Sequence, residues 1–421
     1  MNPLAKEEEY LLKSTRSSFL WTRLLNVPFY AILSLLPLIL YKEMKITALQ
    51  IAAAVALKPL SALLASYWSV SIHKRQDRLN SNIVWANLLR YFPFLFFPWI
   101  ESTWLMIFAF GSYMTLNRGV VPAWMEIFKR NIRGETREKV FAYGSTLDYL
   151  GPAILPLAIG VFLDDFNHSW RWLFFGTACL GIFSTYFLYK LPPIPIKREE
   201  LFLAKPLTWI EKIKKPWEQS WELLKSRRDF AKFQIGFMFG GAGLMVIAST
   251  LPMFFVDVLH LSYTAMALAI ALCKGIGFVS TTPLWIKLFR RIDLYSFSSL
   301  VTLLAALFPI FLLGAKVHVA FLYSAYLLYG FMQAGSELGW HMSGPVFAKD
   351  EESSLFSQTN VLSVGVRGCF APFLGSLLYS YSNSTVVMVV GGLLCLIAAE
   401  KMGRYGRALK TQPANLPLPI D

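Results

Sequence analysis

The stretch LYSFSSLVTLLAALFPIFLLGA, residues 294–315, contains 22 residues and no charged side chain. A transmembrane helix needs roughly 20 consecutive, mostly apolar residues to cross the hydrocarbon core of a bilayer. The stretch therefore predicts a membrane-spanning helix. Pro309 lies inside it, but packed membrane helices tolerate proline, so the prediction is unchanged.

Similar apolar stretches recur along the whole chain of 421 residues, of which 55% are apolar and 16% charged. Soluble domains have about 25% charged residues, so this composition excludes a protein that is mainly water-soluble. It also leaves too few residues for a separate catalytic domain. We expect an all-α membrane protein with twelve transmembrane helices, and the internal prolines Pro28, Pro93 and Pro156 do not change this expectation. The predicted spans are 19–41, 47–70, 82–100, 103–127, 139–163, 169–190, 231–257, 262–286, 294–315, 318–347, 355–380 and 384–400.

The net charge of +14 would suggest a nucleic-acid partner in a soluble protein, but here the position of the charge is more informative. Thirty Lys and Arg residues fall on one side of the predicted spans and four on the other. An excess of basic residues is typical of the cytoplasmic side of a membrane. The bias predicts an integral multi-pass protein of the plasma (inner) membrane with both termini in the cytoplasm. Its expected partner is the lipid bilayer, with no nucleic acid.

A long connection divides the predicted spans into two sets of six. We expect an N-terminal six-helix half at 1–190, a cytoplasmic linker at 191–230, a C-terminal six-helix half at 231–400 and a cytoplasmic tail at 401–421. Within the linker, apolar residues recur every four positions, which is typical of an interfacial helix that buries tryptophan in the membrane surface. A solvated linker that only orients the halves is the alternative. The recurring residues are Trp209, Ile213, Trp217 and Trp221.

Three motifs follow one another between about residues 115 and 180. The fourth predicted span ends with LNRGVVPAWMEIF (116–128), the fifth contains LGPAILP (150–156) and the sixth begins with SWRWLFF (169–175). This order, together with the plan of six plus six spans, resembles the major facilitator superfamily. The resemblance implies a secondary transporter that rocks two halves about a midplane site. The loop YWSVSIHKRQDR (67–78) lacks the glycine and aspartate of the superfamily's signature loop, which argues against its drug-efflux antiporters.

Eight charged residues lie inside the predicted spans, where each costs roughly 2.5–3.5 kcal/mol unless it has a partner. Six are basic and two are acidic, and a cavity with excess positive charge attracts anions, so we expect a small organic anion as solute. An internal salt bridge, or a side chain that reaches the membrane surface, is the alternative for these residues. Arg90 is expected to pair with a neighbouring span. The candidate substrate-binding residues are Arg23, Asn26, Lys58, Arg118, Lys274 and Arg367.

Three titratable residues are candidates for proton coupling: Asp148, Glu337 and His341. Glu337 and His341 lie one helical turn apart. We expect Glu337 to be held away from bulk water, which raises the pKa of a carboxylate, and an imidazole titrates near neutral pH. Aligning spans four and ten places Arg118 opposite Glu337, and the same offset places Asp148 opposite Arg367. A salt bridge between Asp148 and Arg367 would stabilise one state of a transport cycle. A permanent pair between Glu337 and Arg118 is the structural alternative to coupling.

Enzyme motifs are absent from the sequence, which has no nucleotide-binding loop, no H-E-x-x-H and no CxxC pair. The four cysteines lie in apolar stretches without metal-ligand spacing. We therefore expect a monomeric, gradient-driven transporter without enzymatic activity, cofactor, metal or structural disulfide. The glycines of KGIGF (274–278) predict close helix packing. An exporter of amphipathic compounds and a non-transporting membrane sensor of the same fold are the alternatives.

Overall fold

The computed structural model describes residues 3–74, 78–132, 134–166, 169–192, 209–348, 351 and 353–411. These residues form helices and short connections, and no strand occurs within the described ranges. Eight helical segments among them are long and apolar enough to cross a membrane, so the expectation of an all-α protein is confirmed. The count of twelve spans stays a prediction. Two parts of the predicted linker and tail, 193–208 and 412–421, lie outside the described residues.

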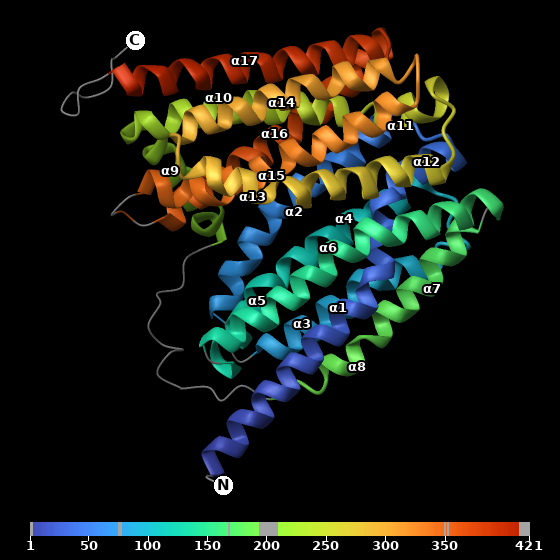
Figure 1. Cartoon of the computed structure of the whole chain (residues 1–421). Coiled ribbons are helices and arrows are strands. Elements are labelled where there is room, and N and C mark those ends of the chain that lie inside the picture. The colour runs from blue at the N-terminus through green and yellow to red at the C-terminus, as the bar shows by residue number, and fades with distance from the viewer. Residues whose placement is uncertain are drawn as a thin grey trace. The chain divides into compact units, whose positions relative to one another are not determined.

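The chain divides into two compact units, and the first comprises Met1–Ile46 and Leu60–Leu207. Its longest helix, α1, packs along both α6 and α7, while α3 contacts α4 and α7 (Figure 1). A single helix, α2, contributes its first part to the second unit and its last part to the first. The helices of this unit are α1 Pro3–Met44, α2 Ala48–Lys74, α3 Leu79–Tyr91, η2 Phe92–Phe96, α4 Thr103–Gly119, α5 Val121–Asn131, α6 Gly134–Asp165, α7 Trp170–Phe183 and α8 Thr185–Leu188.

Three predicted spans of the first unit are interrupted, and one of them, 169–190, is divided into α7 and α8 at Ser184. The range 82–100 contains α3 followed by the 3₁₀ helix η2, which has Pro93 at its start. Proline has no N–H and cannot continue the hydrogen-bond ladder of an α-helix, so the α-helix ends before Pro93 and a 3₁₀ turn follows. That 82–100 forms one membrane span stays a prediction. The range 103–127 is likewise divided into α4 and α5, and α5 has a proline in its first turn. In contrast, Pro28, Pro156 and Pro309 lie inside α-helices, as expected.

An aromatic cluster joins five elements of the first unit, α1, α3, η2, α4 and α7. The fully buried ring of Phe29 on α1 contacts Tyr91, Phe94, Tyr113 and Phe174, with ring centroids between 4.7 and 6.0 Å apart. Edge-to-face aromatic pairs of this kind contribute about 0.5–1.5 kcal/mol beyond their area burial. The cluster fixes these five elements around the charged residues described below.

The second unit comprises Thr47–Pro59 and Thr208–Asp421. In it α17 packs along α10 and α14, α13 packs against α15, and α10 packs against α16 (Figure 1). Its helices are α9 Trp209–Ser226, α10 Arg228–Ala248, α11 Leu251–Met253, η4 Phe254–Val258, α12 Tyr263–Ala267, η5 Leu268–Cys273, α13 Lys274–Phe289, α14 Leu294–Gly314, α15 Ala320–Ala348, α16 Ser353–Tyr381 and α17 Ser384–Thr411. Both η4 and η5 are π-helical turns, and η5 directly precedes Lys274.

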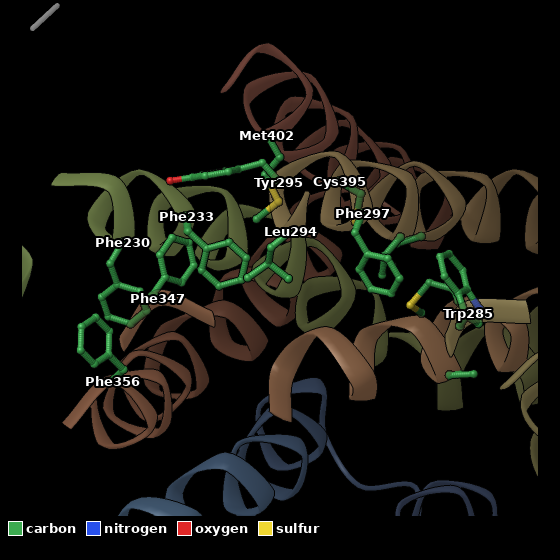
Figure 2. Packing of buried hydrophobic residues seen from close by; sticks show 14 of the residues in the cluster. Phe230, Phe233, Trp285, Leu294, Tyr295, Phe297, Phe347, Phe356, Cys395 and Met402 are labelled. Carbon is green, nitrogen blue, oxygen red and sulfur yellow. The ribbon is translucent and has the colours of Figure 1, made fainter. Parts of the chain in front are cut away.

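The core of the second unit is rich in aromatic side chains (Figure 2). Phe230 on α10 packs against Phe347 of α15 and Phe356 of α16, with ring centroids 5.2 and 5.0 Å away. Trp285 of α13 stacks edge-on against Phe297 of α14, and its Nε1 donates to the carbonyl of residue 331 on α15 at 2.7 Å. These contacts hold α10 and α13–α16 together.

Two glycines bring α13 and α15 into backbone contact. A β-carbon at Gly277 would overlap the carbonyl oxygen of Leu327, and one at Gly330 would overlap the carbonyl oxygen of Lys274. Small residues permit such close approach of helices in membranes. The close packing predicted from KGIGF is therefore confirmed.

Buried polar side chains link three helices of the second unit. The Gln234 amide of α10 donates to Asn360 Oδ1 of α16, and Asn360 Nδ2 donates to Ser343 Oγ of α15 at 2.7 Å. All three side chains are less than 5% exposed. Because buried polar groups are costly when unpaired, this chain of hydrogen bonds fixes the register of the three helices.

The described part of the predicted linker forms the helix α9, which packs against α16 and α10. Leu223 is buried against the core, while Ile213, Trp217 and Trp221 remain exposed. A hydrogen bond to Glu218 raises the pKa of Lys214, which keeps this exposed residue cationic. One face of α9 therefore exposes apolar side chains, and the cationic residue Lys214 lies on the same helix.

Candidate functional site

Each unit contains its own cavity with charged residues in its wall. The cavity of the first unit has a volume of about 170 Å³ and is lined from α1, α3, α4, α5, α6 and α8. The cavity of the second unit has a volume of about 360 Å³ and is lined from α2, α10, α14, α15, α16 and α17. Because the charges would otherwise face hydrocarbon, we take these two cavities as the candidate sites.

In the first cavity, Arg23 of α1 forms an ion pair with Asp148 of α6. Both side chains are partly buried, and the Arg23 guanidinium also lies 5.0 Å from the ring centroid of Phe19. Asn26, one turn after Arg23, lines the same cavity and accepts a hydrogen bond from Ser184 Oγ at 3.4 Å. The structure thus brings together three of the residues predicted from the sequence.

Arg90 of α3 is a residue of this cavity that was not among the candidates for substrate binding. It is 4% exposed and donates to Asn117 Oδ1 of α4 at 2.7 Å and to Asn87 Oδ1 of its own helix. The expected pairing with a neighbouring span is therefore confirmed, with α4 as that span. The sequence does contain a sign of this polar site: Asn87 lies three residues before Arg90, on the same face of the helix.

In the second cavity, Arg367 of α16 is 8% exposed and donates from Nη1 to the carbonyl of Phe237 at 2.7 Å. Its guanidinium also lies over the Phe237 ring, 4.8 Å from the centroid. Lys58 of α2 lines the same cavity, together with Trp340 and Tyr329. Lys58 and Arg367 are the charged residues among those that line this cavity, and carboxylates are absent from that set.

Lys274 lies close to this second site but does not line the cavity. Its Nζ is 6.0 Å from the ring centroid of Tyr329, and it interacts electrostatically with Lys58 and with Glu337. Its position at the start of α13 places it directly after the π-helical turn η5.

Glu337 and His341 are in contact on α15, with His341 Nε2 3.5 Å from Glu337 Oε2. Their side chains are 49% and 71% exposed within the described chain. Other parts of the protein therefore cover only about half of Glu337, so protein burial alone does not desolvate it. The predicted coupling role rests on the contact with His341 rather than on burial.

Asp148 and Arg367, which were predicted to pair with each other, have other partners in this structure, whereas the pair of Glu337 and Arg118 stays a prediction. Asp148 pairs with Arg23, and Arg367 binds a carbonyl of its own unit. Arg118 lies in the last turn of α4, where its side chain is exposed and outside the cavity wall of the first unit. Its predicted substrate contact stays a prediction.

The four cysteines are free thiols, and no cluster of three or more metal-ligating side chains occurs among the described residues. The residues of the two cavities are instead cations, amides, hydroxyls and aromatic rings.

Comparison of the sequence with models of protein families shows which family the chain belongs to. Residues 24–348, more than half of the chain, match the model of the Major Facilitator Superfamily. The chain belongs to this superfamily. As a member of the Major Facilitator Superfamily it is a membrane transporter and not an enzyme, as expected from the sequence.

Solved structures of other Major Facilitator transporters share the fold. A peptide transporter in complex with alafosfalin superposes with a TM-score of 0.70 at 13% identity, covering 95% of this chain and 99% of that one. The nucleoside transporter NupG gives 0.69 at 12% identity, covering 92% and 98%. A bacterial homologue of the human lysosomal transporter Spinster, inward-facing and unoccupied, gives 0.63 at 15% identity, covering 99% and 100%. No curated protein matches the sequence significantly. At these identities the likeness establishes the fold alone.

Proposed function

We propose that the protein is a secondary active transporter that moves a small organic anion across the membrane by alternating access. The proposal includes twelve spans in two six-helix halves, residues 1–190 and 231–400, which rock about a midplane site. It also includes the plasma (inner) membrane as the location, both termini in the cytoplasm and a monomeric state. The basic bias of the loops supports this orientation.

The observation that carries the proposal is the charge of the second cavity. Lys58 and Arg367 line it, and the other lining residues include no carboxylate, so the cavity wall itself carries two positive charges. Glu337, which lies outside the wall, interacts electrostatically with Lys58. A cavity with a positively charged wall attracts anions, and charge-assisted hydrogen bonds from arginine favour carboxylate or phosphate groups. Phe237 and Trp340 add aromatic surface in contact with one another, with ring centroids 5.3 Å apart. An anion with an apolar or aromatic part fits these walls best.

Proton coupling is the second part of the proposal. Asp148 holds Arg23 in an ion pair, and protonation of Asp148 would release the guanidinium for a substrate anion. Glu337 and His341 form a second pair that exchanges a proton over one helical turn. In this scheme Asn26, Arg118 and Lys274 contribute to solute binding during different parts of the cycle.

Uptake by proteoliposomes tests the proposal. The purified protein is reconstituted and supplied with labelled solutes sorted by net charge, and the best anion is then measured with Lys58→Gln, Arg367→Gln and the control Lys287→Gln. Loss of a hydrogen bond to a charged group costs about 1.5–3 kcal/mol, so each cavity variant should reduce kcat/KM about tenfold or more. Lys287→Gln removes the same type of charge from an exposed position of α13 outside the cavity and should leave uptake unchanged.

The two alternatives predict other outcomes. An exporter of amphipathic compounds is favoured by a largely apolar cavity of about 640 Å³ beside α9, whose wall includes Trp217, Trp221 and Leu224. It would move neutral or cationic amphipaths and would be insensitive to Lys58→Gln. A non-transporting sensor would bind solutes without any uptake.

A further inference from the structure

The wall of the first cavity carries one more positive charge than negative charge. The charged residues among the lining residues are Arg23, Arg90 and Asp148. Arg23 and Asp148 form an ion pair with each other, and Asp148 also interacts electrostatically with Arg90. Because one carboxylate faces two cations, the cavity keeps a net charge of one positive charge.

The hydrogen-bond partners of Arg90 do not remove this charge. Asn117 and Asn87 accept through neutral amide oxygens, and the rings of Tyr91 and Tyr113 lie 4.8 and 5.7 Å from the guanidinium. Burying an unbalanced charge is costly even when its hydrogen bonds are made. A bound anion would remove most of that cost.

The cavity also has hydrogen-bond donors without acceptors. Arg90 Nε is buried and has no hydrogen-bond partner, so one of the five guanidinium N–H donors is unused. The hydroxyl of Thr22, whose side chain lines the same cavity and is 5% exposed, also has no partner. Unsatisfied buried donors in a cavity with a net positive charge are the features expected of an anion site.

The size of the cavity limits the ligand. A water molecule takes up about 30 Å³ of liquid, so a cavity of about 170 Å³ holds a small anion with a few waters. Chloride, nitrate, formate and acetate fit this volume, and so does a single carboxylate group of a larger solute.

We propose that the first cavity is a binding site for one small monovalent anion, a free ion or a single carboxylate group of a solute, held by Arg90. The site is separate from the cavity of the second unit, which carries the proposed transport function. The amides of Asn117 and Asn87 position the guanidinium, since each accepts one of its N–H groups.

Thermal unfolding of the purified full-length protein tests this site. The protein, in a neutral detergent, is unfolded in sodium acetate, nitrate or chloride and, as reference, in sodium gluconate of equal ionic strength, because gluconate is far bulkier than the other three anions and would leave no room in the cavity for the waters that accompany them. The wild-type midpoint should be higher in the small anions by about 2 °C or more at saturating concentration. A midpoint that is the same in all four salts would overturn the proposal.

Two variants assign the effect to Arg90. Arg90→Gln removes the cation, and Asn117→Asp supplies a built-in carboxylate of nearly the same shape beside it. Both should lose the difference between small anions and gluconate, and Asn117→Asp should raise the midpoint in gluconate above that of the wild type. Lys287→Gln, which removes an exposed cation outside both cavities, should keep the wild-type response. If Arg90→Gln and Asn117→Asp keep the response as well, the anion binds elsewhere and the inference is wrong.

The two sources of the anion are distinguished by uptake in proteoliposomes. If a free ion occupies the site, acetate or nitrate stabilises the protein without competing with solute uptake. If the carboxylate of the solute occupies it, acetate competes with uptake and the solute itself stabilises the wild type but not Arg90→Gln. A failure of the anion-transport proposal, in which the solute proves to be neutral, leaves the salt response at Arg90 unaffected.

Discussion

The guanidinium of Arg367 occupies the space that a side chain at position 241 would need. A β-carbon at Gly241 of α10 would overlap Nη1 and Cζ of Arg367 on α16. The absence of a side chain at Gly241 therefore allows the arginine to reach the carbonyl of Phe237, one turn earlier on the same helix.

Gly241→Ala should displace Arg367 and reduce solute uptake as strongly as Arg367→Gln does, about tenfold or more. Overpacking at such a position also costs about 1–3 kcal/mol of stability. The matched control is Gly176→Ala on α7, because nothing lies within 4 Å of a β-carbon there. The control should unfold at the same or a slightly higher temperature. Equal uptake by the two variants would show that Arg367 does not act from its observed position.

Glu337→Gln mimics a permanently protonated carboxyl group. It should abolish accumulation of solute driven by a pH gradient but preserve solute binding and passive exchange, measured in proteoliposomes with and without an imposed gradient. Glu218→Gln on α9 removes a carboxylate that pairs with Lys214 at the surface and serves as control. Gradient-driven accumulation by Glu337→Gln with wild-type pH dependence would exclude Glu337 as the coupling group.

Asn360→Ala should destabilise the second unit, because it leaves both the Gln234 amide and the Ser343 hydroxyl without their partner on α16. A buried polar group left unsatisfied costs about 1–3 kcal/mol. The unfolding midpoint in detergent measures the loss. Thr359→Val, on the same helix turn, is the control, since the Thr359 hydroxyl bonds only within its own helix, to the carbonyl of Leu355. Similar midpoints for the two variants would contradict the expectation that the hydrogen bonds from Gln234 through Asn360 to Ser343 stabilise the second unit.

Reporter fusions test the proposed orientation. Reporters placed after residues 200 and 415 should both report the cytoplasm, because the connections with excess Lys and Arg remain on that side. A reporter after residue 316, in the connection between α14 and α15, should report the opposite side and controls for export of the reporter. A fusion at 200 or 415 that reports the outside would mean that the number of spans is wrong.

The long apolar helices could be predicted from the sequence because length and hydropathy alone decide them. The stretch 294–315 corresponds to α14, Leu294–Gly314, with almost the same ends. The interruption at Pro93 could not be distinguished from the tolerated prolines, because tolerance depends on whether neighbouring groups satisfy the freed carbonyls. Pro309 lies inside α14, and its side chain is buried in the second unit.

The sequence predicted which charged residues belong to the candidate sites better than it predicted which of them interact with one another. A charge inside an apolar stretch is visible in the sequence, and so Arg23, Lys58, Asp148 and Arg367 were all identified. Their partners depend on tertiary packing: Arg23 and Asp148 are 125 positions apart, and Arg90 and Asn117 are 27 apart. The internal alignment of the halves paired residues by symmetry, whereas ion pairs follow local distance.

The glycine contacts between α13 and α15 have a mechanical consequence. Because Gly277 and Gly330 place backbone against backbone, sliding of α13 along α15 would bring larger side chains into these contacts, and we expect the two helices to move together. Lys274 begins α13 and Glu337 lies on α15, so we expect the distance between these two residues to change little. The π-helical turn at Leu268–Cys273 directly precedes Lys274, and π-helical turns are among the few places where helices kink, so we expect bending at this turn rather than within the paired helices.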